Sequence, residues 1–127
     1  MTLRRALQRL LVSATALILP AAAAAAAPQA VCGFGGGDPD HGKAIYAKAC
    51  ASCHAANGRG MLPGAPDFTK KGGVLTKSHA ALEDHIIHGF KSPNSRAAMP
   101  PRGGKPGLTD QDMKDVHAYL HKAFGCG

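Results

Sequence analysis

The spacing of apolar and polar residues predicts a first helix that begins near residue 38. Asp38 has the side chain of a helix N-cap, and Pro39 suits the first helical position. Small and apolar residues then recur at the helical interval, at Gly42, Ile45, Tyr46, Ala49 and Cys53. We therefore expect a helix whose buried face continues into the cysteine-containing segment.

A second stretch with helical periodicity follows a suitable N-cap, Ser78. It places Leu82 and Ile86 on the buried face, and Gly89 is the expected end of the helix.

The last predicted helix has the clearest signals. Thr109 is the expected N-cap, and Asp112 stands three residues later, as in a capping box. The apolar stripe consists of Met113, Val116, Leu120, Ala123 and Phe124. Gly125 is expected to end the helix.

The segments between these helices, residues 55–77 and 90–107, are rich in glycine and proline, which is typical of irregular loops. The chain has no internal repeat and no convincing β alternation. The predicted fold class is therefore all-α.

Residues 1–26 have the features of a secretory signal peptide. Three arginines precede an apolar run over 10–19 and a tract of alanines, with cleavage expected near Ala26. Ten apolar residues are short for a bilayer span of about 20. We expect a periplasmic protein without membrane insertion after cleavage, or a membrane-anchored one if the leader stays uncleaved.

The remaining chain divides into a glycine-rich linker, 27–37, and one domain, 38–125. The loss of three leader arginines leaves 12 basic and 8 acidic side chains, a formal net charge of +4. This mild excess favours steering of a protein partner with an acidic surface. No basic run interleaved with aromatic residues indicates nucleic-acid binding.

The segment Cys50-Ala51-Ser52-Cys53-His54 carries the chemistry. Two thiols three residues apart can each form a thioether to one haem vinyl group, while the next residue, a histidine, reaches the iron. A thioredoxin-like redox pair needs a βαβ setting, which the pattern lacks. A zinc site needs a second pair of ligands at suitable spacing, and none follows.

Over about residues 38–124 the chain resembles a class I c-type cytochrome. The shared features are Gly42 and Tyr46 before the cysteine motif, Met99-Pro100 downstream, and a last helix that contains Tyr119 and Leu120. The resemblance implies a small bundle of helices and loops around one covalently attached haem c. It also implies that the first and last helices cross closely at Gly42, with Tyr119 packed nearby.

Three methionines compete to be the second axial ligand of the iron. Met113 belongs to the helical stripe, where core packing is the better account. Met61 follows His54 by only seven residues, which leaves little chain to reach the opposite haem face. Met99 matches the methionine of the family, so we expect His54 and Met99 to bind the iron; Met61 and a histidine stay open as alternatives.

The resemblance also assigns Pro66 as the proline whose carbonyl oxygen holds the ring of His54, with Pro63 as the alternative. The remaining histidines include two closely spaced pairs, His117 with His121 and His85 with His88. We expect these at the edges of buried helix faces rather than on a metal ion.

Cys32 and Cys126 stand at the two ends of the domain, in a compartment that permits disulfides. We expect a bridge between them, which the chain-entropy model values at about 4 to 5 kcal/mol.

Ligation by histidine and methionine occupies both axial coordination positions of the haem iron and leaves none for a substrate. We therefore expect a non-enzymatic, monomeric one-electron carrier that serves redox partner proteins. A haem subunit of a larger dehydrogenase or reductase complex and a five-coordinate gas-binding or peroxidase-type protein are the alternatives. Basic residues expected around an exposed haem edge are Lys43, Lys48, Lys70, Lys71, Lys91, Arg96, Arg102 and Lys105.

Overall fold

The computed structural model describes residues 35–125. The predicted leader (1–26), most of the predicted linker, Cys32 and Cys126 lie outside this range, and with them the expected disulfide.

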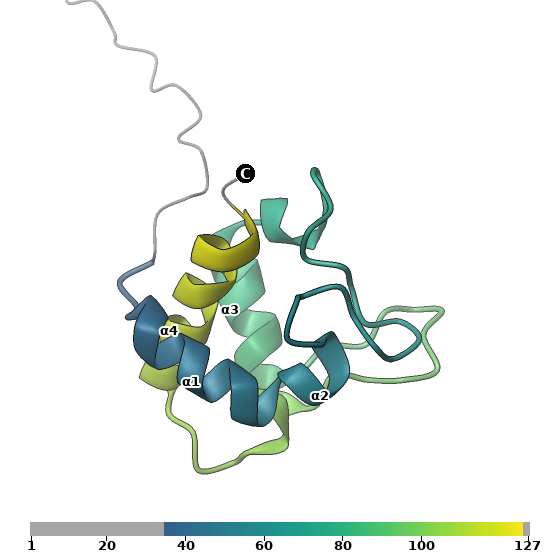
Figure 1. The fold of residues 1–127 in the computed structure, drawn as a ribbon. Helices are drawn as coiled ribbons and strands as arrows, with labels where there is room; N and C mark the ends of the chain where they lie inside the picture. The colour runs from purple at the N-terminus through teal and green to yellow at the C-terminus, as the bar shows by residue number, and fades with distance from the viewer. Residues whose placement is uncertain (1–34, 126–127) are drawn as a thin grey trace, which may run out of the picture.

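The described residues form helices joined by long loops (Figure 1). The α-helices are α1 (Pro39–Ala49), α2 (Ala51–His54), α3 (His79–His88) and α4 (Asp110–Leu120). Short 3₁₀ turns at Val74–Thr76 and Pro101–Gly104 interrupt the loops, and a π-turn over His121–Gly125 extends α4. Residues 35–125 contain no β-strand; Phe90 and Met99 form an isolated antiparallel bridge. The all-α prediction is confirmed.

Helix α1 begins at the predicted N-cap. The Asp38 carboxylate accepts hydrogen bonds from the backbone N–H groups of Asp40 and His41, at 2.9 and 3.3 Å. The predicted continuous helix is interrupted at Cys50, where the backbone leaves ideal helical geometry and α2 begins. The motif is therefore presented on a short helix of its own.

Helix α4 begins with the predicted capping box, in which Thr109 and Asp112 exchange side-chain and backbone hydrogen bonds. Met113, Val116 and Leu120 are buried as expected. The prediction for Ala123 is wrong, because its side chain is exposed. The wider π-turn that starts at His121 changes the angular position of the residues after it.

The first and last helices, α1 and α4, cross in direct backbone contact. A Cβ atom on Gly42 would collide with the carbonyl group of Asp115 and the amide nitrogen of Val116, so only glycine permits this approach. The predicted crossing at Gly42 is confirmed. Tyr119 packs one helical turn further along, on Tyr46, with ring centroids 5.2 Å apart.

The buried carboxylate of Asp115 ties the start of α1 to α4. It accepts hydrogen bonds from the backbone N–H of Asp38 at 2.8 Å and from the side chain of Gln111 at 3.0 Å. The ring nitrogen Nδ1 of His41 lies 2.7 Å from its second oxygen. These bonds satisfy the charge that the crossing buries.

Helix α3 begins at the predicted cap, Ser78, and ends at Gly89, whose φ of 83° suits glycine. The loop after α2 and the loop after α3 lie together on one side of the molecule (Figure 1), where a Cβ on Gly64 would touch the hydroxyl of Ser95. No helix among residues 35–125 is long and apolar enough to cross a membrane.

Candidate functional site

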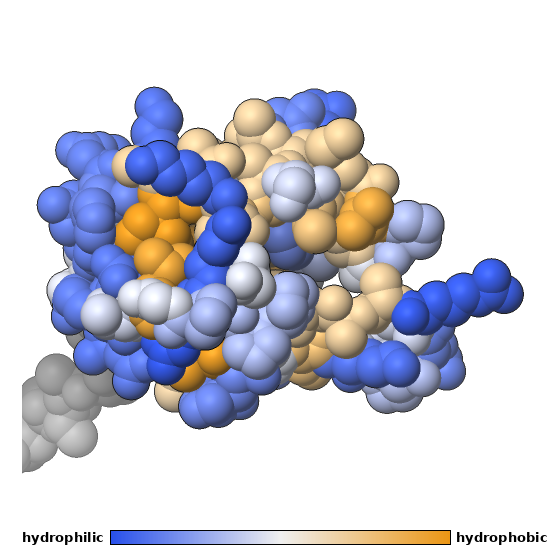
Figure 2. All heavy atoms as spheres, turned by 90° about the horizontal axis from the view of Figure 1, so that it is seen from below, coloured by the Kyte–Doolittle hydropathy of each residue, from blue (hydrophilic) through white to orange (hydrophobic). Residues whose placement is uncertain are grey.

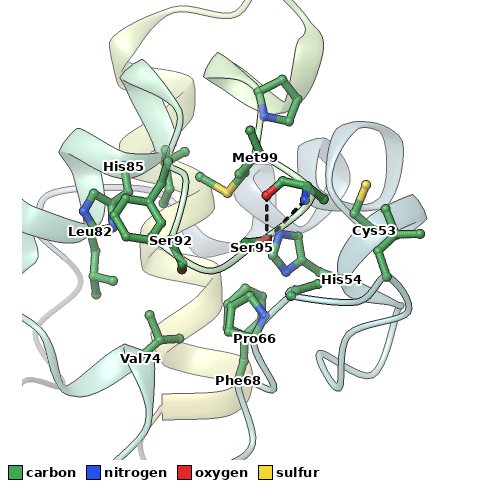
Figure 3. A pocket seen from close by; sticks show the side chains of 18 of the residues that line it. Cys53, His54, Pro66, Phe68, Val74, Leu82, His85, Ser92, Ser95 and Met99 are labelled. Atoms are coloured by element: carbon green, nitrogen blue, oxygen red, sulfur yellow. Dashed lines mark hydrogen bonds between the residues drawn. The ribbon is translucent and has the colours of Figure 1, made fainter.

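An apolar cavity of about 330 Å³ opens between α2, α3, α4 and the two loops (Figure 3). Its volume falls in the range of about 300 to 1,000 Å³ that is usual for small-molecule and cofactor sites. Apolar side chains of all these elements form much of its wall, among them Phe68, Val74, Leu82, Ile86, Phe90 and Leu120. From below, apolar residues gather over part of the molecular surface, between hydrophilic borders (Figure 2).

The structure brings the sequence-predicted residues to this cavity. Cys53, His54 and Met99 line it, and Met99 and His54 also line a smaller adjoining cavity of about 90 Å³ with Cys50 and Cys53. The two cysteines are free thiols. Two thiols, one imidazole and one thioether are thus collected around two adjoining apolar cavities.

His54 is buried, with 7% of its surface exposed, and stacks on Phe68 with ring centroids 4.8 Å apart and planes 17° apart. The phenol of Tyr46 donates a hydrogen bond to the carbonyl oxygen of Ala55 at 2.7 Å, which holds the end of α2 against α1. Burial lowers the pKa of His54 and keeps its ring neutral. A neutral imidazole is the form that binds metals.

Nδ1 of His54 is buried and has no hydrogen-bond partner among the described residues. The hydrogen bond expected from this nitrogen to Pro66 is therefore not formed in the structure. Pro63 and Pro66 both line the cavity, and Figure 3 shows Pro66 beside His54. The choice of Pro66 stays a prediction.

Met99 reaches the cavity because its backbone pairs with Phe90 through two hydrogen bonds, of 3.0 and 2.8 Å. Its side chain points into the cavity (Figure 3). Met61 is 68% exposed and is absent from the lining of both cavities, whereas Met113 is 1% exposed in the core. Of these three, Met99 alone lies where it can bind an ion together with His54.

Burial and, to a lesser degree, the nearby Cys53 raise the pKa of the Cys50 thiol to about 11. Cys50 therefore remains a neutral thiol at pH 7, as expected of a side chain held against an apolar cavity rather than of a reactive thiolate.

None of the eight basic residues expected around a haem edge lines either cavity. Arg102 donates hydrogen bonds to Asp110 and to the carbonyl oxygen of Leu108. Lys77 does line the larger cavity, with its ammonium nitrogen 5.6 Å from the centre of the Phe90 ring. Sequence reasoning missed Lys77, because its position depends on how the preceding loop folds.

The histidine pairs behave differently from their prediction. His117 and His121 are fully buried, with 0% and 1% of their surfaces exposed, rather than at the edge of a buried face. The other pair divides: His85 lines the larger cavity and stacks on Phe90 at 3.9 Å, while exposed His88 bonds to Asp84.

This donor set fits one covalently attached haem: thiols for the vinyl groups, a buried neutral imidazole and a thioether for the iron, and an apolar wall for the macrocycle. A helical fold and a site of this kind define a c-type haem protein.

Comparison with known proteins agrees. Residues 39–124 match the cytochrome c family, so the chain belongs to this family, as a class I monohaem c-type cytochrome. Cytochrome c-555 of Prosthecochloris aestuarii is 34% identical over 85 residues, which cover 65% of this chain and 85% of the relative. The cofactor is haem c.

Two further similarities concern larger proteins. The cytochrome c subunit of the quinone-type alcohol dehydrogenase of Gluconobacter oxydans is 32% identical over 95 residues, covering 71% of this chain but 20% of that subunit. The crystal structure of cytochrome CL from Methylophaga aminisulfidivorans superposes with a TM-score of 0.52 at 18% identity, covering 68% of this chain and 53% of that one. This last similarity concerns the fold alone.

Proposed function

We propose that the protein is an exported, monomeric carrier of single electrons. In this proposal Cys50 and Cys53 hold the haem through thioethers, and His54 and Met99 bind its iron. The observation that carries it is that the His54 imidazole and the Met99 thioether line the same apolar cavity, with a free thiol beside them. The domain then spans 38–125, and the mature chain begins after cleavage near Ala26.

Haem supplies an iron that passes between the ferric and ferrous states. Neutral His54 and the uncharged thioether of Met99 would both hold this iron, which would leave it free to exchange electrons but without a position for a substrate. The apolar wall lowers the local dielectric constant and favours the iron state of lower charge, which raises the reduction potential.

Pro66 completes the arrangement as the acceptor for Nδ1 of His54. Support comes from the buried nitrogen itself, which lacks a partner while Pro66 stands at the same cavity. A hydrogen bond from Nδ1 to the carbonyl oxygen of Pro66 would fix the tautomer of His54 and leave Nε2 for the iron.

The test of the axial ligand is the optical spectrum of the oxidised, haem-loaded protein. We expect a far-red band from sulfur-to-iron charge transfer, its loss in Met99→Ala, and CO binding to the reduced variant. Met61→Ala is the matched control, since its side chain is 68% exposed and should leave the spectrum unchanged. A wild-type protein that lacks the band and binds CO at neutral pH would contradict the proposal and favour a five-coordinate gas-binding or peroxidase-type protein.

Electron transfer requires docking of a redox partner, for which we propose one with an acidic surface. The mild positive charge and Lys77 at the cavity support this choice. The exposed side chains of Leu62 and Phe90, at 47% and 40%, offer apolar contacts beside it. Rates of electron transfer to such a partner should fall with rising salt concentration.

A second candidate is a haem subunit within a dehydrogenase or reductase complex. The similarity to a dehydrogenase cytochrome c subunit favours it. Purification from the native membrane and periplasmic fractions distinguishes the two. A free carrier is recovered alone and accepts electrons from a separate enzyme, whereas a subunit is recovered with its complex.

A further inference from the structure

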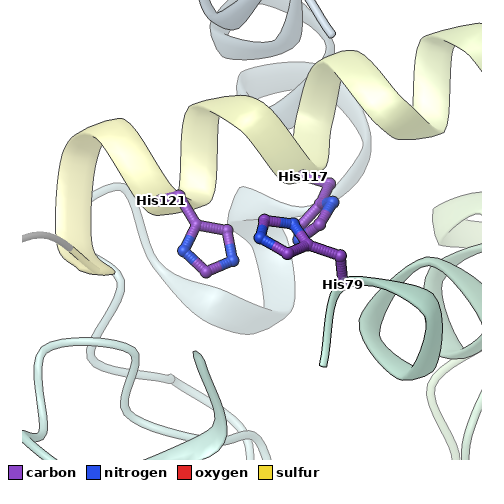
Figure 4. A group of neighbouring side chains, drawn as sticks. All are labelled: His79, His117 and His121. Carbon is purple, nitrogen blue, oxygen red and sulfur yellow. The ribbon is translucent and has the colours of Figure 1, made fainter. Parts of the chain in front are cut away.

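Three histidine side chains converge at a place outside both cavities. His117 and His121 stand one turn apart on α4 and its extension, and His79 is the first residue of α3. Their ring centroids lie 4.7 to 5.0 Å apart (Figure 4). This histidine cluster joins two helices at a point where neither the cysteine motif nor Met99 takes part.

The nitrogens of the cluster have the arrangement of a metal site. One nitrogen of each residue lies within 4.8 Å of the other two. Nδ1 of His79, Nε2 of His117 and Nε2 of His121 are all buried and have no hydrogen-bond partner among the described residues. Buried polar atoms without partners are rare and unfavourable, and one shared cation satisfies all three at once.

Glu83 orients the central ring. Its carboxylate lies 3.1 Å from Nδ1 of His117. An ionised carboxylate only accepts, so Nδ1 donates and the lone pair is left on Nε2, the unpartnered atom. A carboxylate behind a histidine is the usual outer partner of a metal-binding imidazole.

His117 and His121 are in the neutral form that metal binding needs. Burial, together with the neighbouring His117 and His79, lowers the pKa of His121 to about 4. Burial also lowers the pKa of His117, against the opposing effect of Glu83. No proton therefore has to leave His117 or His121 for a cation to bind at neutral pH.

The backbone at Gly35 lies directly against the cluster. A Cβ atom on Gly35 would lie 3.3 Å from Oε1 of Glu83 and 3.5 Å from Nδ1 of both His79 and His117. Gly35 also has a φ of 51°, which favours glycine. A residue without a side chain thus covers the cluster.

From this geometry we propose that His79, His117 and His121 bind one Zn²⁺ ion, with water as the fourth ligand. Three imidazole nitrogens without a carboxylate ligand suit zinc and not calcium or magnesium. Zn–N bonds of about 2.0 to 2.1 Å place ligand nitrogens roughly 3.3 Å apart, so the rings close slightly on binding. The ion fastens the start of α3 to the end of α4, two helices whose Leu82 and Leu120 line the haem cavity. The proposal does not depend on how the haem iron is ligated.

The test uses the haem-loaded protein, freed of extraneous metal with a chelator and titrated with Zn²⁺ against a chromogenic competitor. We expect one equivalent to bind and zinc X-ray absorption to show three histidine nitrogens. His79→Ala should weaken binding by about 100-fold or more and Glu83→Gln by about 10- to 100-fold. His88→Ala is the matched control on α3, because this exposed ring lies outside the cluster; it should bind as the wild type does.

His79 is half-buried, so its truncation disturbs packing less than truncation of His117. Unchanged haem absorption and circular dichroism in His79→Ala and Glu83→Gln show that a loss of zinc is not a loss of fold. Wild-type protein that binds no stoichiometric zinc would overturn the proposal. A folded His79→Ala variant that keeps full affinity for Zn²⁺ would also overturn it. So would a His88→Ala variant that loses as much affinity for Zn²⁺ as His79→Ala does.

Discussion

The α1–α4 crossing and the cavity side of the molecule are built in opposite ways. At the crossing, Gly42 allows backbone contact and Asp115 bonds to groups at the start of α1, so the chain fills the space with its own atoms. On the cavity side, two glycine- and proline-rich loops and the inner faces of α3 and α4 enclose a space of about 330 Å³.

This difference shows which part of the fold depends on the cofactor. Among residues 35–125, four of the eight buried core residues line the larger cavity: Phe68, Leu75, Leu82 and Leu120. A haem bound in the cavity would complete their packing on that side. A small domain has few other sources of stability, so a covalently attached haem would stabilise the part of the core that the crossing does not.

The largest expected effect comes from removing the thiols. Cys50→Ala with Cys53→Ala should abolish covalent haem entirely, because no thioether can form. Haem staining of the denatured protein measures this, and circular dichroism should show a large loss of helix. Ser52→Ala, an exposed position between the two thiols, is the control and should keep its haem. Covalent haem in the double variant would contradict the assignment.

Gly42→Ala tests the close packing of the α1–α4 crossing. Its methyl group would collide with the backbone of α4, so the helices must separate. We expect the free energy of unfolding of the haem-loaded protein to fall by about 3 kcal/mol, measured with denaturant. Gly107→Ala is the matched control, since nothing lies within 4 Å of a Cβ there. Equal effects of the two substitutions would show that the crossing is not tightly packed.

The smallest expected effect is a pH dependence at the crossing. The hydrogen bond with Asp115 raises the pKa of His41. Burial alone would raise the pKa of Asp115, but its hydrogen bonds with His41, the Asp38 amide and Gln111 lower it overall. A histidine whose pKa is raised by folding contributes full stability below its pKa in the unfolded chain, and this contribution is lost as pH rises through the folded pKa. A carboxyl group whose pKa is lowered contributes full stability above its pKa in the unfolded chain, and this contribution is lost as pH falls through the folded pKa.

The pair should therefore contribute most between about pH 4 and pH 6.5. We expect the difference in unfolding midpoint between wild type and His41→Gln to shrink as pH rises from 6 to 8, because glutamine keeps a donor but does not titrate. Parallel pH profiles for the two proteins would show that His41 makes no such contribution.

Sequence patterns predicted the helices well where the signal was local. Asp38, Ser78 and Thr109 cap the helices expected of them, since a cap bonds to backbone groups within three residues. The pattern failed at Ala123, where a π-turn changed the register, and at Cys50, where the first helix breaks. At Ala123 the reason is geometric, because the wider turn rotates the residues after His121 away from the 3.6-residue repeat.

The site divides in the same way. The motif from Cys50 to His54 is contiguous, so residue types and spacing alone are enough to predict haem attachment there. The position of Met99 at the cavity depends on pairing with Phe90, and that of Lys77 on the loop before it. Periodicity could place His117 and His121 on one face of α4, but it could not bring His79 to them.

By itself, then, the sequence determined the all-α class, the helix starts, the attachment motif and the crossing at Gly42, because each is encoded in neighbouring residues or in a family resemblance. Only the tertiary structure showed that Met99 lines the same cavity as His54 while Met61 is exposed, that Lys77 lies at this cavity, and that three histidines meet between α3 and α4. These contacts join side chains far apart along the chain, and loop geometry and helix packing, which no local pattern encodes, bring them together.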